Sequence, residues 1–311
     1  MKVHGVTIGI PVYNERRHIE QAVRSAAPQC ETLLVSDNAS TDGSAEICER
    51  LCREYQNLRL VRQASNLGAL DNFKFLLDQA STPRFMWLGA HDFIPEGYVE
   101  TLAQALDASP DAALAFGMTR NVSNEGTEIG WYRFDYHARI AGPSPLARLD
   151  GMICCLRNCS LLHGLFRTDL LRKSWEHGNF LGFDRVLLAR AAMQGRLIYV
   201  PATHLCRRIV RDDDTWQKRM VRVSGVDTGG KPVRHMMQFR LESLMRDATV
   251  HAGWRGYWLR LKIRVVLIGK YGPYGATAPA RVLAAVVHPF TRAARAVNRQ
   301  FRRLGRSPEG D

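Results

Sequence analysis

The chain has 311 residues, of which 46% are hydrophobic and 23% charged, so it is long enough to bury the core of one large or two ordinary domains. Its net charge of +13 arises in the last third, because residues 206–311 contain 22 Lys and Arg against 8 Asp and Glu, whereas residues 1–205 contain 21 against 22. The longest apolar runs, 282–287 and 265–268, are far shorter than the ~20 residues that cross a bilayer, and the polar start MKVHG predicts that no signal peptide is present.

The first third of the chain alternates short apolar runs with amphipathic stretches. Residues 6–12 are a near-continuous apolar run, typical of a central parallel strand. Further strands are expected at 33–35, 58–61, 84–88 and 112–116, with one helix between each consecutive pair. We expect Ser40, Thr41 or Asp42 to cap the helix that starts near Gly43. This order of elements predicts an α/β fold with a doubly wound, mostly parallel sheet.

Polar loops follow the expected strands at Tyr13, Asp37, Asn66 and His91, and right-handed crossovers bring such loops to one edge of a sheet. The residues alone leave two roles open for Asp37, which either meets a ligand at that edge or closes an Asx turn. No GxGxxG or GxxxxGK[ST] motif is present, which argues against a dinucleotide oxidoreductase and a P-loop NTPase. The phosphates of a nucleotide then need another partner, such as a divalent metal on Asp92.

Four motifs occur in order along this region, namely IPVYNE, VSDNASTDGS, SNLG and WLGAHD. Together they resemble the nucleotide-binding half of the family 2 inverting glycosyltransferases with the GT-A fold, of the type that builds bacterial surface glycans. The resemblance covers residues 6–117. It returns in shorter pieces at 163–171 (HGLFRTDLL) and 182–201 (GFDRVLLARAAMQGRLIYVP).

This resemblance implies that the first three loops line a pocket for a nucleotide-sugar. The implied residues are Pro11, Tyr13, Glu15, Asp37, Asn66 and Gly68. The carboxylate of Glu15 would lie near the ribose, and that of Asp37 would accept a hydrogen bond from the base, as fits a pyrimidine imide N–H.

The resemblance also implies that Asp92 ends a motif that holds Mg²⁺ or Mn²⁺ on the diphosphate. The usual acidic pair is missing here, because the motif ends Gly89, Ala90, His91, Asp92. Either Asp92 ligates alone while His91 orients the phosphate or the acceptor, or both residues ligate, or His91 is a turn residue bonded to the backbone. Imidazole is an acceptable ligand for Mn²⁺ and a poorer one for Mg²⁺.

Asp184, in the piece beginning GFDR, matches the family's later acidic motif, whose carboxylate serves as the general base in an inverting displacement. The alternative role for Asp184 is an N-cap of the following helix. His163 either contacts the acceptor or the donor sugar, or is a core histidine. Arg207 and Arg208 follow a strand expected at 197–200, where they either clamp the diphosphate or belong to a solvated basic face.

Residues 119–151 have no sustained period and many Gly, Pro and aromatic residues, so we expect a loop region that shapes the acceptor side of the pocket. Trp131 or Tyr132 would stack on a sugar there, or pack against the core. We therefore expect a nucleotide-sugar-binding half (1–118), an acceptor-side half (119–210) and a basic, largely helical region (211–311).

The basic region is expected to contain helices at 235–251 and 254–270, and the mixture of aromatic, aliphatic and basic residues in the second suits a membrane interface. A last helix from about residue 292 has five arginines on one face, namely Arg292, Arg295, Arg299, Arg302 and Arg306. These helices either tether the protein to an anionic membrane surface or are solvated packing helices.

Two functions of different classes follow from these observations. The first is a metal-dependent inverting glycosyltransferase that uses a UDP- or dTDP-sugar, with Mn²⁺ or Mg²⁺ as cofactor and a lipid-linked or cell-surface glycan precursor as acceptor. The seven cysteines have irregular spacing and no CxxC pair, so we expect a reducing, cytoplasmic location, peripheral at the inner face of the membrane. The alternative is a nucleic-acid-binding protein with an α/β scaffold and a basic tail, whereas the first function predicts no nucleic-acid partner.

Overall fold

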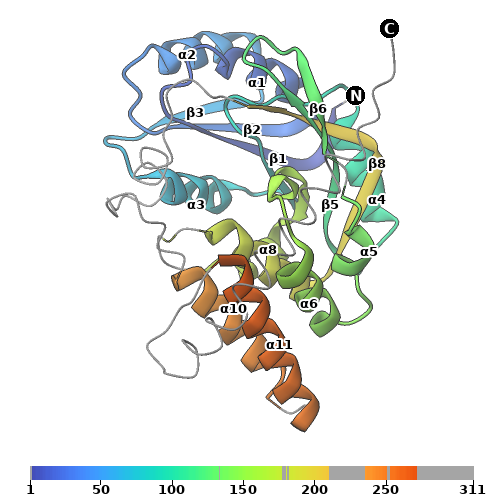
Figure 1. The fold of residues 1–311 in the computed structure, drawn as a ribbon. Coiled ribbons are helices and arrows are strands. Elements are labelled where there is room, and N and C mark those ends of the chain that lie inside the picture. Colours follow the sequence, from blue (N-terminus) through green and yellow to red (C-terminus); the bar gives the residue numbers. More distant parts are fainter. Residues whose placement is uncertain are drawn as a thin grey trace, which may run out of the picture. The chain divides into compact units, whose positions relative to one another are not determined.

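The computed structural model describes residues 2–132, 134–176, 180, 182–209, 235–250 and 253–271, which belong to two compact units, 1–233 and 234–311 (Figure 1). The first unit is built on an eight-stranded sheet of order β3-β2-β1-β4-β7-β5-β6, with β8 also paired to β5. The strands are β1 (Val3–Val12), β2 (Cys30–Asp37), β3 (Leu58–Arg62), β4 (Arg84–Trp87), β5 (Ala112–Val122), β6 (Glu128–Tyr132), β7 (Leu165–Arg167) and β8 (Arg196–Arg208). The α/β fold with a mostly parallel sheet in its first half is confirmed.

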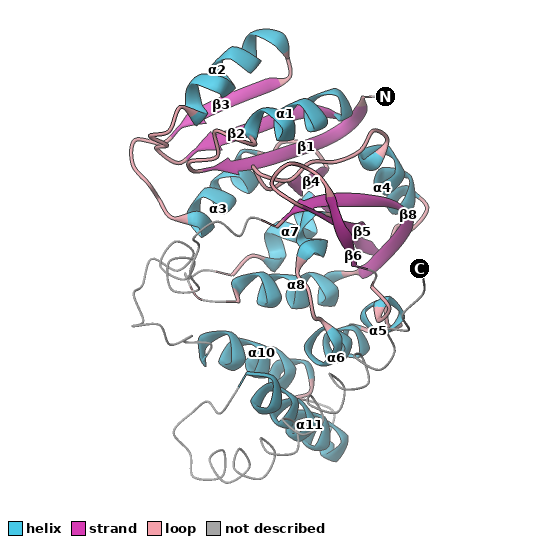
Figure 2. Cartoon of the chain, turned by 45° about the horizontal axis from the view of Figure 1, so that its top comes forward, coloured by secondary structure: helices cyan, strands magenta, loops and turns pink. Residues whose placement is uncertain are grey.

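Helices cover both faces of this sheet (Figures 1 and 2). One face carries α1 (Ile19–Ala26), the short η1 (Ala27–Gln29), α2 (Ser44–Glu54) and α4 (Tyr98–Asp107), whose apolar residues form a buried core cluster with β1 and β2. The other face carries α3 (Ala69–Gln79), α7 (Thr168–Ser174) and α8 (Phe183–Gln194). Because β1 is covered on both sides, its consecutive residues 6–10 are all buried, as its continuous apolar sequence predicted.

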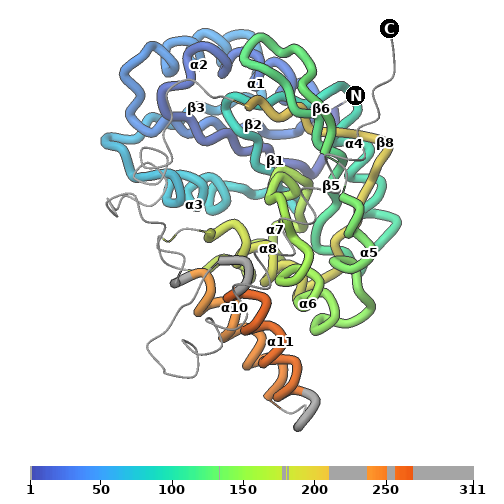
Figure 3. The backbone as a smooth tube through the Cα atoms, in the orientation of Figure 1, coloured from blue at the N-terminus to red at the C-terminus, as the bar shows by residue number. Residues whose placement is uncertain are grey.

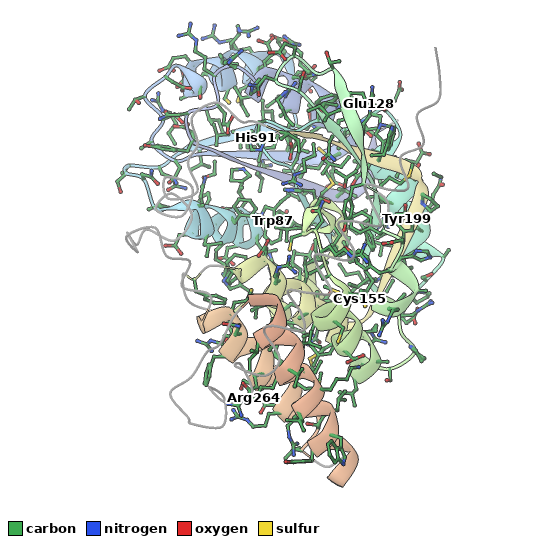
Figure 4. All side chains as sticks on the ribbon, in the orientation of Figure 1. Trp87, His91, Glu128, Cys155, Tyr199 and Arg264 are labelled. Atoms are coloured by element: carbon green, nitrogen blue, oxygen red, sulfur yellow. The ribbon has the colours of Figure 1, made fainter. Side chains whose placement is uncertain are left out.

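One antiparallel strand, β7, separates the two halves of the sheet, whose chain path can be followed in Figure 3. Strands β1 to β4 pair in parallel, but the three-residue strand β7 lies antiparallel between β4 and β5. Trp87, labelled in Figure 4, ends β4. It packs edge-on against Phe85 and Phe166 and beside Phe73 of α3. The junction at β7 joins the two halves of the sheet. Strand β5 crosses residue 118, where the boundary between the first two regions of the chain was expected.

The expectation of a loop region at residues 119–151 was wrong. Strand β5 continues to Val122 and turns into β6, and α5 (His137–Ile140) and α6 (Pro145–Cys155) follow. The sequence does contain the start signal of α6, because Ser144 accepts a hydrogen bond from the Ala147 amide and Pro145 occupies the first helical position. Strand β6 lacks an apolar period because it is an edge strand whose side chains are mostly exposed.

The second unit contains α10 (His235–Ala248) and α11 (Gly253–Tyr271), which confirms the two helices expected there. The Gln238 amide donates to the Leu267 carbonyl at 3.3 Å and joins the two. None of the helices within the described ranges has the length and apolarity that a membrane span requires. The arginine-rich helix expected from Arg292 lies outside the described residues.

Candidate active site

The loops that leave β1 and β2 are joined by hydrogen bonds at the carboxyl edge of the sheet. The Asn14 amide donates to Ser40 Oγ at 2.9 Å, and the Thr41 amide donates to Asn14 Oδ1 at 2.9 Å. These side chains therefore connect two loops and do not cap α2, whose N-cap is Gly43 with φ of 94°. Asp42 comes closest to the expected capping role, since its Oδ1 accepts from the Ser44 amide at 3.0 Å.

Asp37 ends β2 beside this junction, and its side chain is fully buried. Its Oδ2 accepts a hydrogen bond from the Ser40 amide at 3.2 Å, so the turn role expected for this residue is present. Its Oδ1 is buried without a hydrogen-bond partner in the described structure. A buried acceptor that lacks a partner costs about 1–3 kcal/mol, and a ligand with an N–H group would remove that cost.

The third loop is held against the second by Asn38, a buried residue that our sequence analysis did not single out. Its Nδ2 donates to Asn66 Oδ1 at 2.7 Å and to the Gly68 carbonyl at 3.2 Å, and its Oδ1 accepts from the Leu67 amide at 2.8 Å. Gly68 has φ of 86° and ψ of 164°, a conformation essentially confined to glycine. The side chain of Asn66 thus holds the conformation of this loop. Gly68 places no side chain at this edge of the sheet.

The fourth loop joins the site through His91. Its Nδ1 lies 3.0 Å from Glu15 Oε1, a contact between residues on different loops. A carboxylate only accepts, so Nδ1 carries the proton and Nε2 faces away from Glu15. Burial lowers the pKa of His91, but the charges of Asp92 and Glu15 outweigh burial, and the net pKa is raised. Pro11 lies near the end of β1, where it pairs with Ser36, and Tyr13 directly follows that strand and is 39% exposed.

Asp92 is 2% exposed and tied to the last strand. Its Oδ1 accepts a hydrogen bond from the Arg208 amide at 2.8 Å and lies 3.9 Å from His91 Nε2. A Cβ at position 89 would stand 2.7 Å from Asp92 Oδ2, so only glycine fits the start of this turn without a shift of the carboxylate. His91 and Asp92 therefore face one another in a turn that Gly89 permits.

Arg207 and Arg208 are adjacent but have different environments. Arg208 is 5% exposed, and its guanidinium donates to the His91 carbonyl at 2.6 Å, to Gln21 Oε1 at 2.7 Å and to the Ser123 carbonyl at 3.3 Å. The Arg208 guanidinium is therefore hydrogen-bonded to acceptors of the protein itself. The guanidinium of Arg207, on the opposite side of β8, makes no hydrogen bond or ion pair with the residues that the structure describes.

His163 lies in η2 (Ser160–His163), and its Nδ1 is 3.0 Å from the Trp87 carbonyl. The carbonyl only accepts, so Nδ1 carries the proton and Nε2 remains an acceptor. Burial lowers the pKa of His163, and the charges of Asp92, Arg207 and His91 also act on it. One ring nitrogen of His163 is thus hydrogen-bonded in the core. The residue also lies within electrostatic range of Asp92, His91 and Arg207.

Asp184 lies in the first turn of α8, one residue past the helix start, so it is not the N-cap. Its Oδ1 accepts from the Arg185 amide at 2.9 Å. Burial raises the pKa of the Cys159 thiol, and the charge of Asp184 and a hydrogen bond to it raise that pKa further. The charge of Arg207 acts on the pKa of the same thiol and lowers it.

The aromatic residues Trp131 and Tyr132 of β6 lie on opposite faces, because side chains alternate along a strand. Trp131 packs against His204 and donates to Glu128 Oε1 at 2.9 Å. Tyr132 contacts Phe134 and the Tyr136 hydroxyl, and the charge of Arg185 acts on its pKa, which burial raises. The two aromatic residues therefore have separate partners on opposite faces of β6.

Comparison with known proteins gives one consistent result. A family model described as glycosyl transferase family 2 matches residues 7–166. The glycosyltransferase GlyG of Streptococcus pneumoniae is 24% identical over 131 residues, which are 41% of this chain and 43% of GlyG, so the match spans less than half of that relative.

Solved structures agree on the fold. TarS 1–349 of S. aureus in complex with UDP-GlcNAc superposes with a TM-score of 0.62 at 15% identity, over 88% of this chain and 75% of that one. The mannosyltransferase PcManGT from Pyrobaculum calidifontis, in complex with GDP-Man and Mn²⁺, reaches a TM-score of 0.50 at 18% identity, over 96% of this chain and 82% of that one. With a family model that covers half of its residues and a sheet of the matching GT-A architecture, this chain belongs to glycosyltransferase family 2.

Proposed function

We propose that this protein transfers a sugar from a UDP- or dTDP-sugar to a hydroxyl group, with inversion at the anomeric carbon. The observation that carries the proposal is the buried Oδ1 of Asp37, which lacks a partner at the carboxyl edge of the sheet. Ligands bind at that edge in open α/β sheets, and the imide N3–H of uracil or thymine supplies the missing donor. The complexes of TarS with UDP and UDP-GlcNAc support the same class of donor.

We propose His91 and Asp92 as the ligands of a divalent ion, Mn²⁺ or Mg²⁺. The described residues contain no group of three His, Cys, Asp or Glu side chains placed to hold a metal. A metal ion that also binds phosphate oxygens needs fewer protein ligands, since one or two of them and the phosphates suffice. The 3.9 Å between His91 Nε2 and Asp92 Oδ1 fits such a pair. When bound, the ion supplies positive charge against the charge that develops on the leaving diphosphate.

The remaining steps are assigned to side chains of the chain itself. Arg207, whose guanidinium has no partner among the described residues, binds the diphosphate oxygens in fork geometry. Asp184 accepts the proton of the acceptor hydroxyl as its oxygen attacks the anomeric carbon from the face opposite the diphosphate. A single displacement of this kind inverts the anomeric configuration. We propose that His163, together with Trp131 or Tyr132, contacts the sugar.

Nucleotide binding tests the proposal. We expect UDP and dTDP to bind at least about tenfold more tightly than CDP, because cytosine has no N3–H and leaves Asp37 Oδ1 unpaired. Isothermal titration with each nucleotide, with and without Mn²⁺, measures this difference. Asp37→Ala should abolish the preference. Equal affinity for UDP and CDP, or no binding of any nucleoside diphosphate, would rule out the assignment.

We propose that the acceptor is a lipid-linked or cell-surface glycan precursor, and that the basic region meets an anionic membrane surface. Helix α11 supports this, since it exposes Tyr257 and Trp258, each 58% accessible, among basic residues. Lys and Arg near an anionic leaflet contribute about 1 kcal/mol each, so a cluster of them gives reversible binding.

Vesicle co-sedimentation checks the membrane contact. We expect the full chain to bind vesicles with phosphatidylglycerol, to bind vesicles of phosphatidylcholine alone weakly, and to dissociate as salt screens the charges. A chain truncated after Phe290 loses the arginines of the last segment and should bind the anionic vesicles less. Binding that is the same for both lipids, or unchanged by the truncation, contradicts the tether.

The alternative of a nucleic-acid-binding scaffold is not favoured. It assigns no role to the sheet edge, whereas the family match includes three of the edge loops and the His91 turn. It also predicts that substitutions of Asp92 and Asp184 have no effect on function.

A further inference from the structure

The contact between Glu15 and His91 joins two loops that the chain separates by 76 positions. His91 donates Nδ1–H to Glu15 Oε1 at 3.0 Å, and this bond leaves Nε2 on the side of Asp92. Both side chains are partly shielded, with 37% of His91 and 25% of Glu15 exposed. The imidazole orientation is thus fixed from a neighbouring loop and not by its own turn.

The backbone holds Glu15 in place independently of this bond. Its amide donates to Ser44 Oγ at 2.9 Å, and its carbonyl accepts from the amides of His18 and Ile19 at 3.0 Å. On the other side, the Arg208 amide holds Asp92 Oδ1, and the Arg208 guanidinium holds the His91 carbonyl. Glu15 on one side of the imidazole, and Asp92 and the His91 backbone on the other, are therefore held by hydrogen bonds within the protein that need no ligand.

We propose that Glu15 is the positioning residue of the cation site, which keeps His91 Nε2 available as a ligand beside Asp92 and makes the site prefer Mn²⁺ over Mg²⁺. This inference rests on the proposed function. A metal-bound histidine usually donates its other ring N–H to a carboxylate, which sets the tautomer and the ring orientation. A nitrogen ligand favours a transition-metal ion over Mg²⁺, which prefers oxygen ligands and retains its waters.

Manganese binding to the UDP complex tests the proposal without any measurement of activity. The free Mn²⁺ signal in electron paramagnetic resonance gives the affinity, and electron spin-echo modulation reports a directly bound imidazole through its ¹⁴N coupling. We expect ¹⁴N modulation in the wild type and its loss in His91→Asn. Glu15→Ala should weaken Mn²⁺ binding by about 10–100-fold. Glu15→Gln retains an oxygen that accepts from Nδ1–H and should recover much of that loss.

Controls separate this inference from the function on which it rests. Glu96→Ala removes an exposed carboxylate from the loop after His91 and should leave Mn²⁺ affinity unchanged. UDP affinity without metal, measured for each variant, separates a lost ribose contact at Glu15 from a lost metal ligand. Equal Mn²⁺ affinity in Glu15→Ala and wild type overturns the inference alone. UDP binding with no ¹⁴N modulation overturns the inference together with His91 as a metal ligand, and leaves the proposed sugar transfer standing. Failure of the wild type to bind UDP at all overturns the proposed function as well.

Discussion

Asp184→Asn is expected to lower the rate of transfer by about 10²–10⁴-fold while UDP affinity stays unchanged. Asparagine has nearly the same shape but does not take a proton, so the acceptor hydroxyl reaches the anomeric carbon without a base. Single-turnover transfer and UDP titration on the same preparation measure the two quantities. The start of α8 is preserved in this variant, because the N-cap of the helix is Gly182 and not Asp184.

Asp169→Asn is the matched control for Asp184→Asn. Asp169 is an exposed carboxylate in the first turn of α7, as Asp184 is a partly buried one in the first turn of α8. Each substitution removes a favourable interaction with the helix dipole, worth about 0.3–1 kcal/mol. If Asp184 only stabilised its helix, both variants would show the same small loss of thermal stability and full activity. Transfer retained in Asp184→Asn would therefore refute its role as the base.

Arg207→Ala is expected to reduce transfer by about 10²–10³-fold with little change in stability, because it removes a charge that meets the diphosphate in the transition state. Arg207→Lys keeps the charge but loses the fork, so partial recovery is expected. Single-turnover transfer and thermal unfolding measure the two effects. Arg59→Ala, an exposed arginine on β3, is the control and should alter neither.

Arg208→Ala is the contrasting variant in this experiment. It removes a buried guanidinium together with its hydrogen bonds to the His91 carbonyl and Gln21 Oε1, which should lower the free energy of unfolding by about 1–3 kcal/mol. Full transfer activity in Arg207→Ala would contradict the assignment of the diphosphate to Arg207. A stability loss in Arg207→Ala equal to that of Arg208→Ala would show that Arg207 is structural.

The parallel half of the sheet was predictable because its information is local. Strands covered on both faces appear as continuous apolar runs, and each crossover helix carries its own one-face period. The edge position of Asp37 and His91 followed from the handedness of these crossovers. Among the elements that were not predicted, β6 is an exposed edge strand and β7 has three residues, so neither has enough buried positions to show a period.

The sequence by itself determined the α/β architecture, the family resemblance and the loops that carry the site. Only the tertiary structure decided what neighbouring residues do within it. Arg207 and Arg208 are the same residue type in adjacent positions, and strand alternation together with Gln21 and Ser123 decides which one is buried. Likewise, the bond from His91 to Glu15 joins distant parts of the chain, and no local pattern encodes it, because such contacts form only when the loops of separate strands meet at one edge.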